Sequence, residues 1–235
     1  MNGRTSWIIR GALGVTGLPA LVLMSAMVGF GGLAREAGLT LGEATFATFF
    51  IWALPSMIVL VGGIVAGLSL PATALAVALA SMRFTPMVMA IVPEMRSSST
   101  RRRTLLGLSH FVAITAWVHA IRAFPAVPRE HRAAFFGGFA ITLTVLSTVI
   151  VGTVHQIAPS LPREAAIALV FLTPIYFLTT LWASAKLPSD RPALLLGLGL
   201  GPLIDWVSPS LGLLGAGIIG GTLAFVLARR RNGTS

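Results

Sequence analysis

Long apolar stretches separated by short polar segments make up most of the chain. They predict helices over about residues 11–33, 44–68, 71–93, 104–124, 133–157 and 164–184, followed by a glycine-rich remainder, 192–227, that divides at 205–209. Thr40, with Glu43 three residues later, predicts a capping box at the start of the second helix. Runs of about twenty apolar residues can cross a bilayer as helices. The pattern therefore predicts an all-α polytopic membrane protein with about six to eight transmembrane segments, some of them broken or re-entrant.

The composition agrees with this pattern. Hydrophobic residues make up 55% of the chain and charged residues only 10%, whereas soluble domains carry about 25% charged residues. The basic N-terminus is followed by an apolar run without a clear cleavage site, which predicts a retained first helix. We expect one integral membrane domain over residues 1–235, with a short cytoplasmic N-terminus (1–10) and a cytoplasmic C-terminal tail (229–235).

The net charge of +10 comes mainly from arginines at the ends of the apolar segments, at 101–103, 129, 132 and 229–231. This distribution is typical of cytoplasmic loops next to anionic lipid and not of a nucleic-acid surface. If the N-terminus, the loop 94–104 and the tail share the cytoplasmic side, an even number of crossings separates them. One crossing for each of the first three segments gives an odd number before the loop. A broken or re-entrant pair of half-helices over 71–93 would restore the even count.

Arg83 is the only ionisable side chain between Ala44 and Pro93. A guanidinium at the bilayer centre costs about 2.5–3.5 kcal/mol on insertion scales. One interpretation is that the side chain reaches the headgroups from a helix end. The other is that it faces a cavity and binds an anion such as a substrate carboxylate. Pro71 and Pro86 favour the second interpretation because they indicate a broken helix, and broken helices line the sites of many transporters.

A polar stripe follows the second predicted helix. Its members are spaced three, four and four residues apart, and they are Thr45, Thr48, Trp52 and Ser56. On one straight helix this spacing places them on one face, which in a membrane faces protein or water. Pro55 within the stripe is expected to free a backbone carbonyl, which favours a binding surface. The alternative is ordinary packing, with each hydroxyl bonded to the carbonyl four residues earlier.

Titratable residues in the other segments form no cluster. Thr115, His119 and Arg122 share a face of the fourth predicted helix, whereas His110 lies about half a turn away from His119. Each histidine is either an interfacial or satisfied interior residue or part of a proton relay. Asp205 is the one carboxylate with long apolar sequence on both sides, and it lies either at an interface turn or at a proton site.

Motifs for catalysis and cofactor binding are missing from the sequence. It has no Walker loop, no Gly-x-Gly-x-x-Gly motif of a dinucleotide fold, no His-Glu-x-x-His motif and no cysteine. We therefore expect no enzymatic activity, no cofactor and no metal site. Without an ATP site, any transport is secondary or passive.

Residues 32–44 resemble the AzlC family, the large subunits of two-component bacterial branched-chain amino acid exporters. The family typically reads Gly, a basic residue, Ala-Gly-Leu and then Glu-Ala, and continues into a helix that ends Ala-Gly-Ala-Ala-Gln. Residues 48–57 are the equivalent run here, with Leu54 and Met57 in place of the glycine and the glutamine. The segments 171–177 and the glycine-rich tail are also similar.

Two further motifs extend the resemblance. Ser81-Met82-Arg83 is similar to the family's Asn-Leu-Arg, so the arginine is kept. The family's Thr-Asp-Glu falls at Thr115-Ala116-Trp117, where both acidic residues are missing.

The resemblance implies a multi-pass permease of the bacterial cytoplasmic membrane that exports branched-chain or other small amino acids with a small hydrophobic AzlD-like subunit. The residues expected to bind substrate are Arg83, Thr48, Trp52, Ser56, Thr115 and Trp117. Asp205 and His119 are the candidates for proton coupling. The alternative hypothesis is a non-transporting membrane subunit that binds and stabilises a partner, which the missing acidic residues favour.

Overall fold

The computed structural model describes residues 3–98, 100–162, 190–207 and 212–232, together with single residues between 164 and 189. Every regular element in this part of the chain is helical, as predicted. The helix expected over 164–184 lies largely outside the described residues. The chain forms two compact units, Met1–Val61 with Val77–Thr173 and Gly62–Ala76 with Pro174–Ser235.

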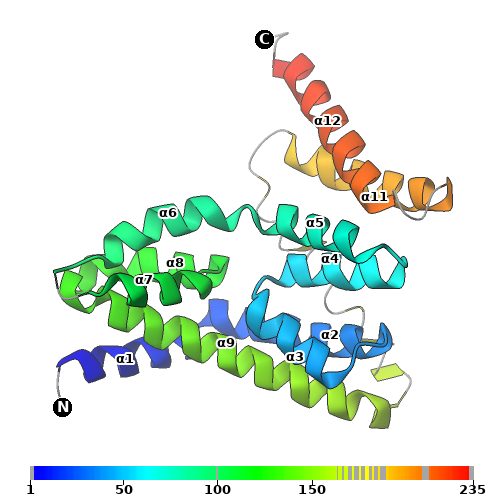
Figure 1. Cartoon of the computed structure of the whole chain (residues 1–235). Helices are drawn as coiled ribbons and strands as arrows, with labels where there is room; N and C mark the ends of the chain where they lie inside the picture. Colours follow the sequence, from blue (N-terminus) through cyan, green and yellow to red (C-terminus); the bar gives the residue numbers. More distant parts are fainter. Residues whose placement is uncertain are drawn as a thin grey trace. The chain divides into compact units, whose positions relative to one another are not determined.

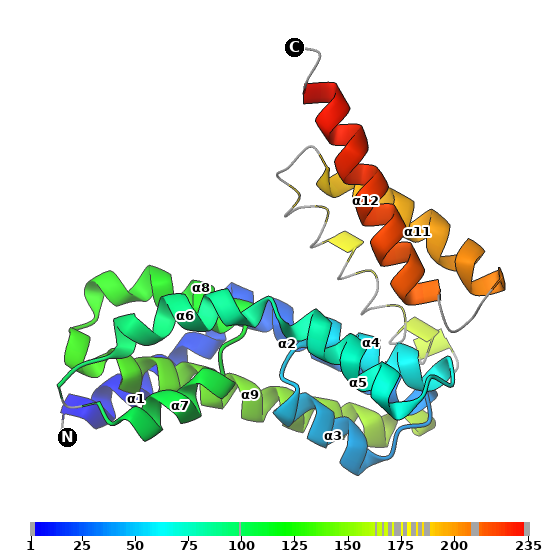
Figure 2. The same cartoon turned by 45° about the horizontal axis from the view of Figure 1, so that its top comes forward.

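The first unit is built around α9 (Arg132–Ile157), which is about 39 Å long at 1.5 Å per residue. Helix α1 (Gly3–Leu13), the short η1 (Gly14–Thr16) and α2 (Leu18–Glu36) run parallel to α9 along its length (Figures 1 and 2). Glycines allow the close approach, since a Cβ on Gly11 would overlap the carbonyl oxygen of Phe135. The helix predicted over 11–33 is interrupted at η1, and α2 begins anew at Leu18, with Pro19 in its first turn.

The predicted single helix over 44–68 is wrong. Helix α3 (Leu41–Phe50) and helix α4 (Leu54–Val65) are separated by three non-helical residues. Helix α3 starts beside the C-terminal end of α9, where Gly152 faces Thr45, and its capping box between Thr40 and Glu43 is present as predicted. Helix α4 runs back in the opposite direction, so the two helices form a re-entrant hairpin (Figures 1 and 2).

Helices α5 (Leu70–Ser81) and α6 (Phe84–Met95) meet at the predicted break around Arg83, with a bend of 47°. A bend of this size fits either a broken span or a re-entrant loop, the two arrangements predicted from the sequence. Helix α6 ends beside the N-terminal end of α9, where Arg132 pairs with Glu94. The break within 71–93 is therefore present as predicted, and the number of crossings before the loop 94–104 stays untested.

The predicted single helix over 104–124 is also two helices. Helix α7 (Arg102–His110) runs beside the N-terminal half of α9, with Leu108 against Gly137. After a break at residues 111–113, α8 (Ile114–Ala123) returns to the same end of α9, where Arg132 donates to the carbonyl of Phe124 at 3.0 Å. Short 3-10 turns lie at Phe124–Ala126, Arg129–His131 and Ala158–Ser160.

Among the described residues, two helical stretches are long and apolar enough to cross a membrane, Leu18–Glu36 and Arg129–Ser160, and the α5–α6 pair makes a third if it is counted as one span. The expected six to eight crossings are therefore not confirmed. Helices α3 and α7 have 10 and 9 residues, or about 15 Å each, which is half of a hydrocarbon core of roughly 30 Å. Two half-length hairpins thus enter the first unit from opposite ends of α9.

The second unit contains α11 (Asp190–Val207) and α12 (Gly212–Asn232), which pack against each other, together with parts of α4 and α5. Gly215 contacts Ile204 across the α11–α12 pair, and Gly63 contacts Thr73 where α4 meets α5. Helix α11 ends at Val207, within residues 205–209, where the glycine-rich remainder was predicted to divide.

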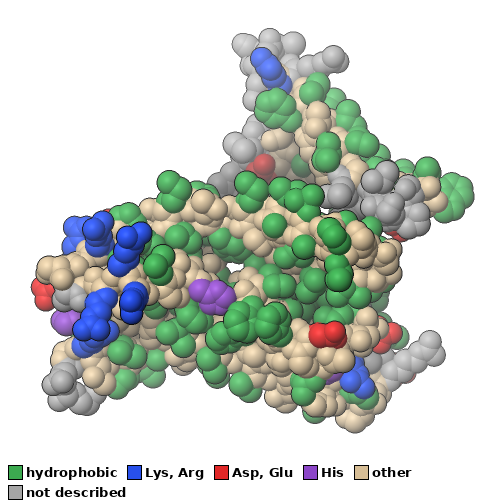
Figure 3. Space-filling view, in the orientation of Figure 1, with side chains coloured by type: hydrophobic (Ala, Val, Ile, Leu, Met, Phe, Trp, Pro, Cys, Tyr) green, Lys and Arg blue, Asp and Glu red, His purple; other side chains and the backbone are tan. Residues whose placement is uncertain are grey.

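Basic side chains gather at one end of the first unit, where α6 ends and α7 begins (Figure 3). Exposed arginines at 96, 101, 102 and 103 come from this connection. Arg4 of α1 lines a pocket together with Arg101, so the N-terminus and the loop 94–104 lie at the same end of the unit. Large apolar side chains such as Phe46, Leu79 and Met89 are exposed elsewhere, as lipid-facing residues are.

Candidate functional site

The two re-entrant hairpins are joined tip to tip by a reciprocal pair of hydrogen bonds. The indole Nε1 of Trp52, in the α3–α4 break, donates to the carbonyl of Phe111 at 3.3 Å. In return, Nε2 of His110 lies 3.0 Å from the carbonyl of Phe49. Because a carbonyl only accepts, His110 carries its proton on Nε2 in this contact. Each tip therefore supplies a donor to the last carbonyls of the other half-helix.

The α5–α6 break is joined to the start of α4 by a hydrogen bond between two hydroxyl groups. Ser81, at the end of α5, lies 2.9 Å from Ser56 in the first turn of α4. Arg83 sits inside this break, half-buried, with its guanidinium carbon 5.1 Å from the ring centroid of Phe84. Its Nε is buried and has no hydrogen-bond partner among the described residues. The three helix breaks are thus linked by hydrogen bonds, and Arg83, which has an unused donor, lies in one of them.

The helix ends at these breaks favour an anion. The carbonyls at the C-terminal ends of α3 and α7 receive protons from the opposing tip. Helices α6 and α8 both begin at a break and run toward the N-terminal end of α9, and neither has a side chain that caps its first turn. The first N–H groups of a helix carry a partial positive charge. Together with the guanidinium of Arg83, these two helix starts make the region of the linked breaks electropositive.

Helix α9 contributes two buried hydroxyl residues at the level of the tips. Thr144 and Ser147 lie at the middle of α9 and are fully buried, and the hydroxyl of Ser147 has no partner among the described residues. The interpretation of the sequence did not include them. The same span also contains Thr142, Thr148 and Thr153, so no signal in the sequence singled out Thr144 and Ser147.

The polar stripe of the second predicted helix is divided between two helices and their break. The hydroxyls of Thr45 and Thr48 donate to the carbonyls four residues earlier, at 2.8 and 2.7 Å, as the packing alternative proposed. Thr48, Trp52 and Ser56 are nevertheless buried next to the tip contacts. Pro55 lies in the first turn of α4, where a proline is tolerated, so it does not free a carbonyl in mid-helix as expected.

Trp52 has a backbone φ of 46°, the left-handed region that non-glycine residues rarely adopt. Such a conformation costs about 1–3 kcal/mol and persists only where the surroundings enforce it. The strained residue is the one whose side chain bridges the two tips. Its geometry is therefore consistent with a functional role for the break.

Helix α8 carries three of the predicted site residues, and the structure places them on two faces. His119 stacks on Phe139 with ring centroids 4.0 Å apart, so the face that it shares with Thr115 packs toward α9. Trp117 is about 200° around the helix from Thr115. Its indole Nε1 is buried and has no partner among the described residues, and the same is true of Nε2 of His119.

Asp205 is exposed near the end of α11 in the second unit. It lies in a different compact unit from Arg83, so a pairing between these two residues stays untested, as does its role in proton coupling. No group of three or more His, Asp and Glu suitable for a metal ion occurs in the described part of the chain.

Comparison with known proteins identifies the family. The family model described as AzlC protein matches residues 19–158, which contain α2 to α9 and all three helix breaks. No curated protein and no solved structure matches the chain. The family is associated with branched-chain amino acid transport. With more than half of its length matched, and with apolar helices long enough to cross a membrane, this chain belongs to the AzlC family of membrane transport proteins.

Proposed function

We propose that the chain is a secondary transporter that exports branched-chain or other small amino acids across the bacterial cytoplasmic membrane. The observation that carries this proposal is Arg83, a half-buried cation whose buried Nε has no partner among the described residues, in a helix break that is hydrogen-bonded to the α3–α4 hairpin. A buried donor without a partner is unusual and calls for a ligand. Broken helices with open N-terminal ends are the means by which many transporters bind a substrate carboxylate.

In this proposal, the guanidinium of Arg83 and the indole N–H of Trp117 donate to the substrate carboxylate. Helices α6 and α8 lie side by side in both views and begin at the breaks, so their first N–H groups add to the attraction (Figures 1 and 2). Hydroxyl oxygens of Thr48 and Ser56 accept from the substrate ammonium. Apolar side chains around the tips surround the substrate side chain.

Thr48, Trp52 and Ser56 are buried, so the proposed site would have to open before a substrate could enter. Substrate entry requires the tips to separate. The α3–α4 hairpin enters from the C-terminal end of α9 and the α7–α8 hairpin from the N-terminal end. Movement of one hairpin at a time would open the site to one side of the membrane at a time, which is the requirement for alternating access.

Proton coupling would use His119 or Asp205. The unpartnered Nε2 of His119 supports this assignment for the histidine. A small hydrophobic AzlD-like subunit is the proposed partner, and the exposed apolar side chains of the first unit offer it a surface within the bilayer.

The test is amino acid efflux from proteoliposomes that contain the chain with and without its small subunit. A hydrogen bond to a charged group contributes about 1.5–3 kcal/mol, so Arg83→Gln should weaken substrate binding by about ten- to a hundred-fold. Arg122→Gln is the matched control, because Arg122 is exposed on α8. Efflux by Arg83→Gln equal to that of the control would refute the site.

A non-transporting role as a partner-binding subunit is the second candidate function. It is favoured by the loss of both acidic residues at Thr115-Ala116-Trp117. In that case the chain would copurify with its partner but would support no substrate-dependent flux. Retained partner binding in Arg83→Gln, together with absent flux in the wild-type protein, would favour this role over export.

A further inference from the structure

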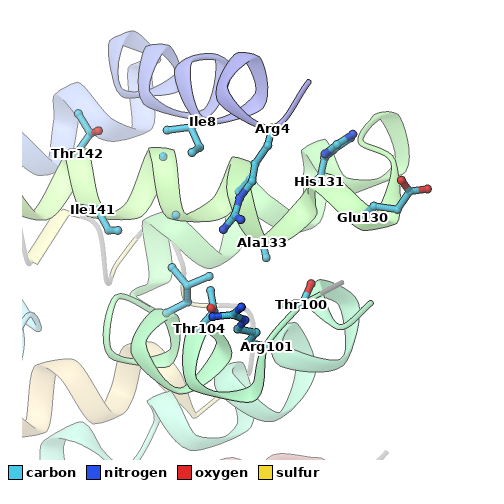
Figure 4. Close-up of a pocket in the computed structure, with 14 residues that line it drawn as sticks. Arg4, Ile8, Thr100, Arg101, Thr104, Glu130, His131, Ala133, Ile141 and Thr142 are labelled. Carbon is cyan, nitrogen blue, oxygen red and sulfur yellow. The ribbon is translucent and has the colours of Figure 1, made fainter. Parts of the chain in front are cut away.

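A groove between α1 and α7 opens at the basic end of the first unit (Figure 4). Its volume is about 820 Å³, and α9 forms its floor. Two adjacent glycines of α9 let the flanking helices pack closely against it. Gly138 lies against the backbone of Ile8 in α1, and Gly137 faces the side chain of Leu108 in α7. The two helices therefore flank α9, and the groove lies between them. We call this the α1–α7 groove.

The lining of the α1–α7 groove changes from charged to apolar along α9. At the N-terminal end of α9 the groove is bordered by Arg4, Arg101 and Thr100. Farther along α9, Ile8, Leu108 and Ile141 line it. From His131 to Thr142 this is a length of about 16 Å at 1.5 Å per residue. Because α9 is a candidate membrane span that begins at this end, the charged part lies at headgroup depth and the apolar part at acyl-chain depth.

Arg4 and Arg101 approach the groove from opposite walls. Arg4 extends from α1 toward α7, and Arg101 lies at the start of α7 (Figure 4). Neither side chain forms an ion pair with a carboxylate among the described residues. Glu130 also borders the groove, but its carboxylate points away from both arginines (Figure 4). The headgroup end therefore carries two cations that have no protein counter-ion in the described part.

We propose that the α1–α7 groove binds one anionic glycerophospholipid. The phosphate lies between the guanidinium groups of Arg4 and Arg101, and an acyl chain follows Ile8, Leu108 and Ile141 along α9. Clusters of arginine at the cytoplasmic end of membrane helices attract anionic lipid. The combination of a charged end with an apolar floor at right angles to the membrane surface matches a lipid and not a soluble anion.

The test uses the full chain purified in detergent and compares phosphatidylglycerol with phosphatidylcholine. The measured quantities are the rise in thermal midpoint on adding each lipid and the lipid mass retained in native mass spectrometry. The groove variant is Arg4→Gln with Arg101→Gln. The matched control is Arg35→Gln with Arg122→Gln, which removes the same charge from exposed positions outside the groove. A third variant, Ala134→Phe, fills the groove without changing charge.

Phosphatidylglycerol should stabilise the wild-type protein and the control equally, and more than phosphatidylcholine does. Its apparent affinity should fall at least ten-fold in the groove variant and in Ala134→Phe. Equal affinity in the groove variant and the control would overturn the proposal, because the attraction would then be general. Equal stabilisation by glycerol 3-phosphate would also overturn it, because a soluble anion would suffice. Retention of a protein subunit that both groove variants release would assign the groove to a protein partner instead.

Discussion

The hydrogen bond between Trp52 and Phe111 joins the two hairpin tips, and Trp52→Phe removes it while keeping an aromatic ring. The net contribution of such a bond is about 0.5–1.5 kcal/mol, and a carbonyl left buried without a donor costs about 1–3 kcal/mol. The strained backbone at position 52 is unchanged by the substitution, so its cost cancels. We expect a loss of about 1.5–3 kcal/mol, or roughly 3–10 °C in thermal midpoint for a chain of this size.

Trp117→Phe is the matched control for this prediction. The indole Nε1 of Trp117 is buried but has no partner among the described residues, so the substitution removes no hydrogen bond in the substrate-free protein. Its thermal midpoint should be unchanged or slightly raised, whereas substrate affinity should fall if Trp117 donates to the carboxylate. Thermal unfolding in detergent, with and without substrate, measures both effects.

A double-mutant cycle between Trp52 and His110 tests whether the tips act as one unit. The bond from His110 to Phe49 links the same two tips, at 3.0 Å. Loss of one hydrogen bond should weaken the other. The free energies of unfolding lost in Trp52→Phe and in His110→Phe should therefore differ from additivity by about 0.5–3 kcal/mol. A Trp52→Phe variant as stable as Trp117→Phe, or strict additivity with His110→Phe, would refute the reasoning.

Two predictions concern stability outside the site. Gly11→Ala places a Cβ on the carbonyl of Phe135 and should destabilise the protein by about 1–3 kcal/mol or more. Gly107→Ala is the control, because its Cβ meets open space in α7, and it should stabilise the protein by about 0.5–1 kcal/mol. Thermal midpoints that shift in the same direction in both variants would contradict the close contact at Gly11. The backbone N–H and the hydroxyl of Thr40 hold the pKa of Glu43 below its usual 4.5. Because the pKa is lowered in the folded state, the stabilisation by Glu43 is complete above pH 4.5 and disappears as the pH falls through the lowered pKa. The difference in thermal midpoint between the wild-type protein and Glu43→Gln should therefore narrow as the pH falls below 4.5. A difference that stays constant with pH would contradict the role of the Glu43 carboxylate.

The sequence contained reliable local signals. The isolated charge of Arg83 between two prolines predicted the α5–α6 break, and Thr40 with Glu43 predicted the start of α3. The prediction that Pro55 lies inside one long helix was wrong. A proline in the first turn marks a helix start, and here it marks the start of α4 instead of a kink in one long helix.

The break at residues 111–113 had no local signal. It contains neither glycine nor proline, and its sequence, Phe-Val-Ala, is compatible with a membrane helix. The carbonyl of Phe111 receives its donor from Trp52, which is 59 residues earlier in the chain. A break that depends on such a distant donor cannot be predicted from the residues around it.

Membrane character and the position of Arg83 were therefore determined by the sequence itself, because partition into hydrocarbon depends on the composition of a window of about twenty residues. The re-entrant hairpins, their tip contacts and the groove above α9 were decided only by the tertiary structure. In lipid, a helix can end inside the membrane only where another part of the protein satisfies its backbone groups. That partner comes from another segment of the chain, and only the folded structure brings it into contact.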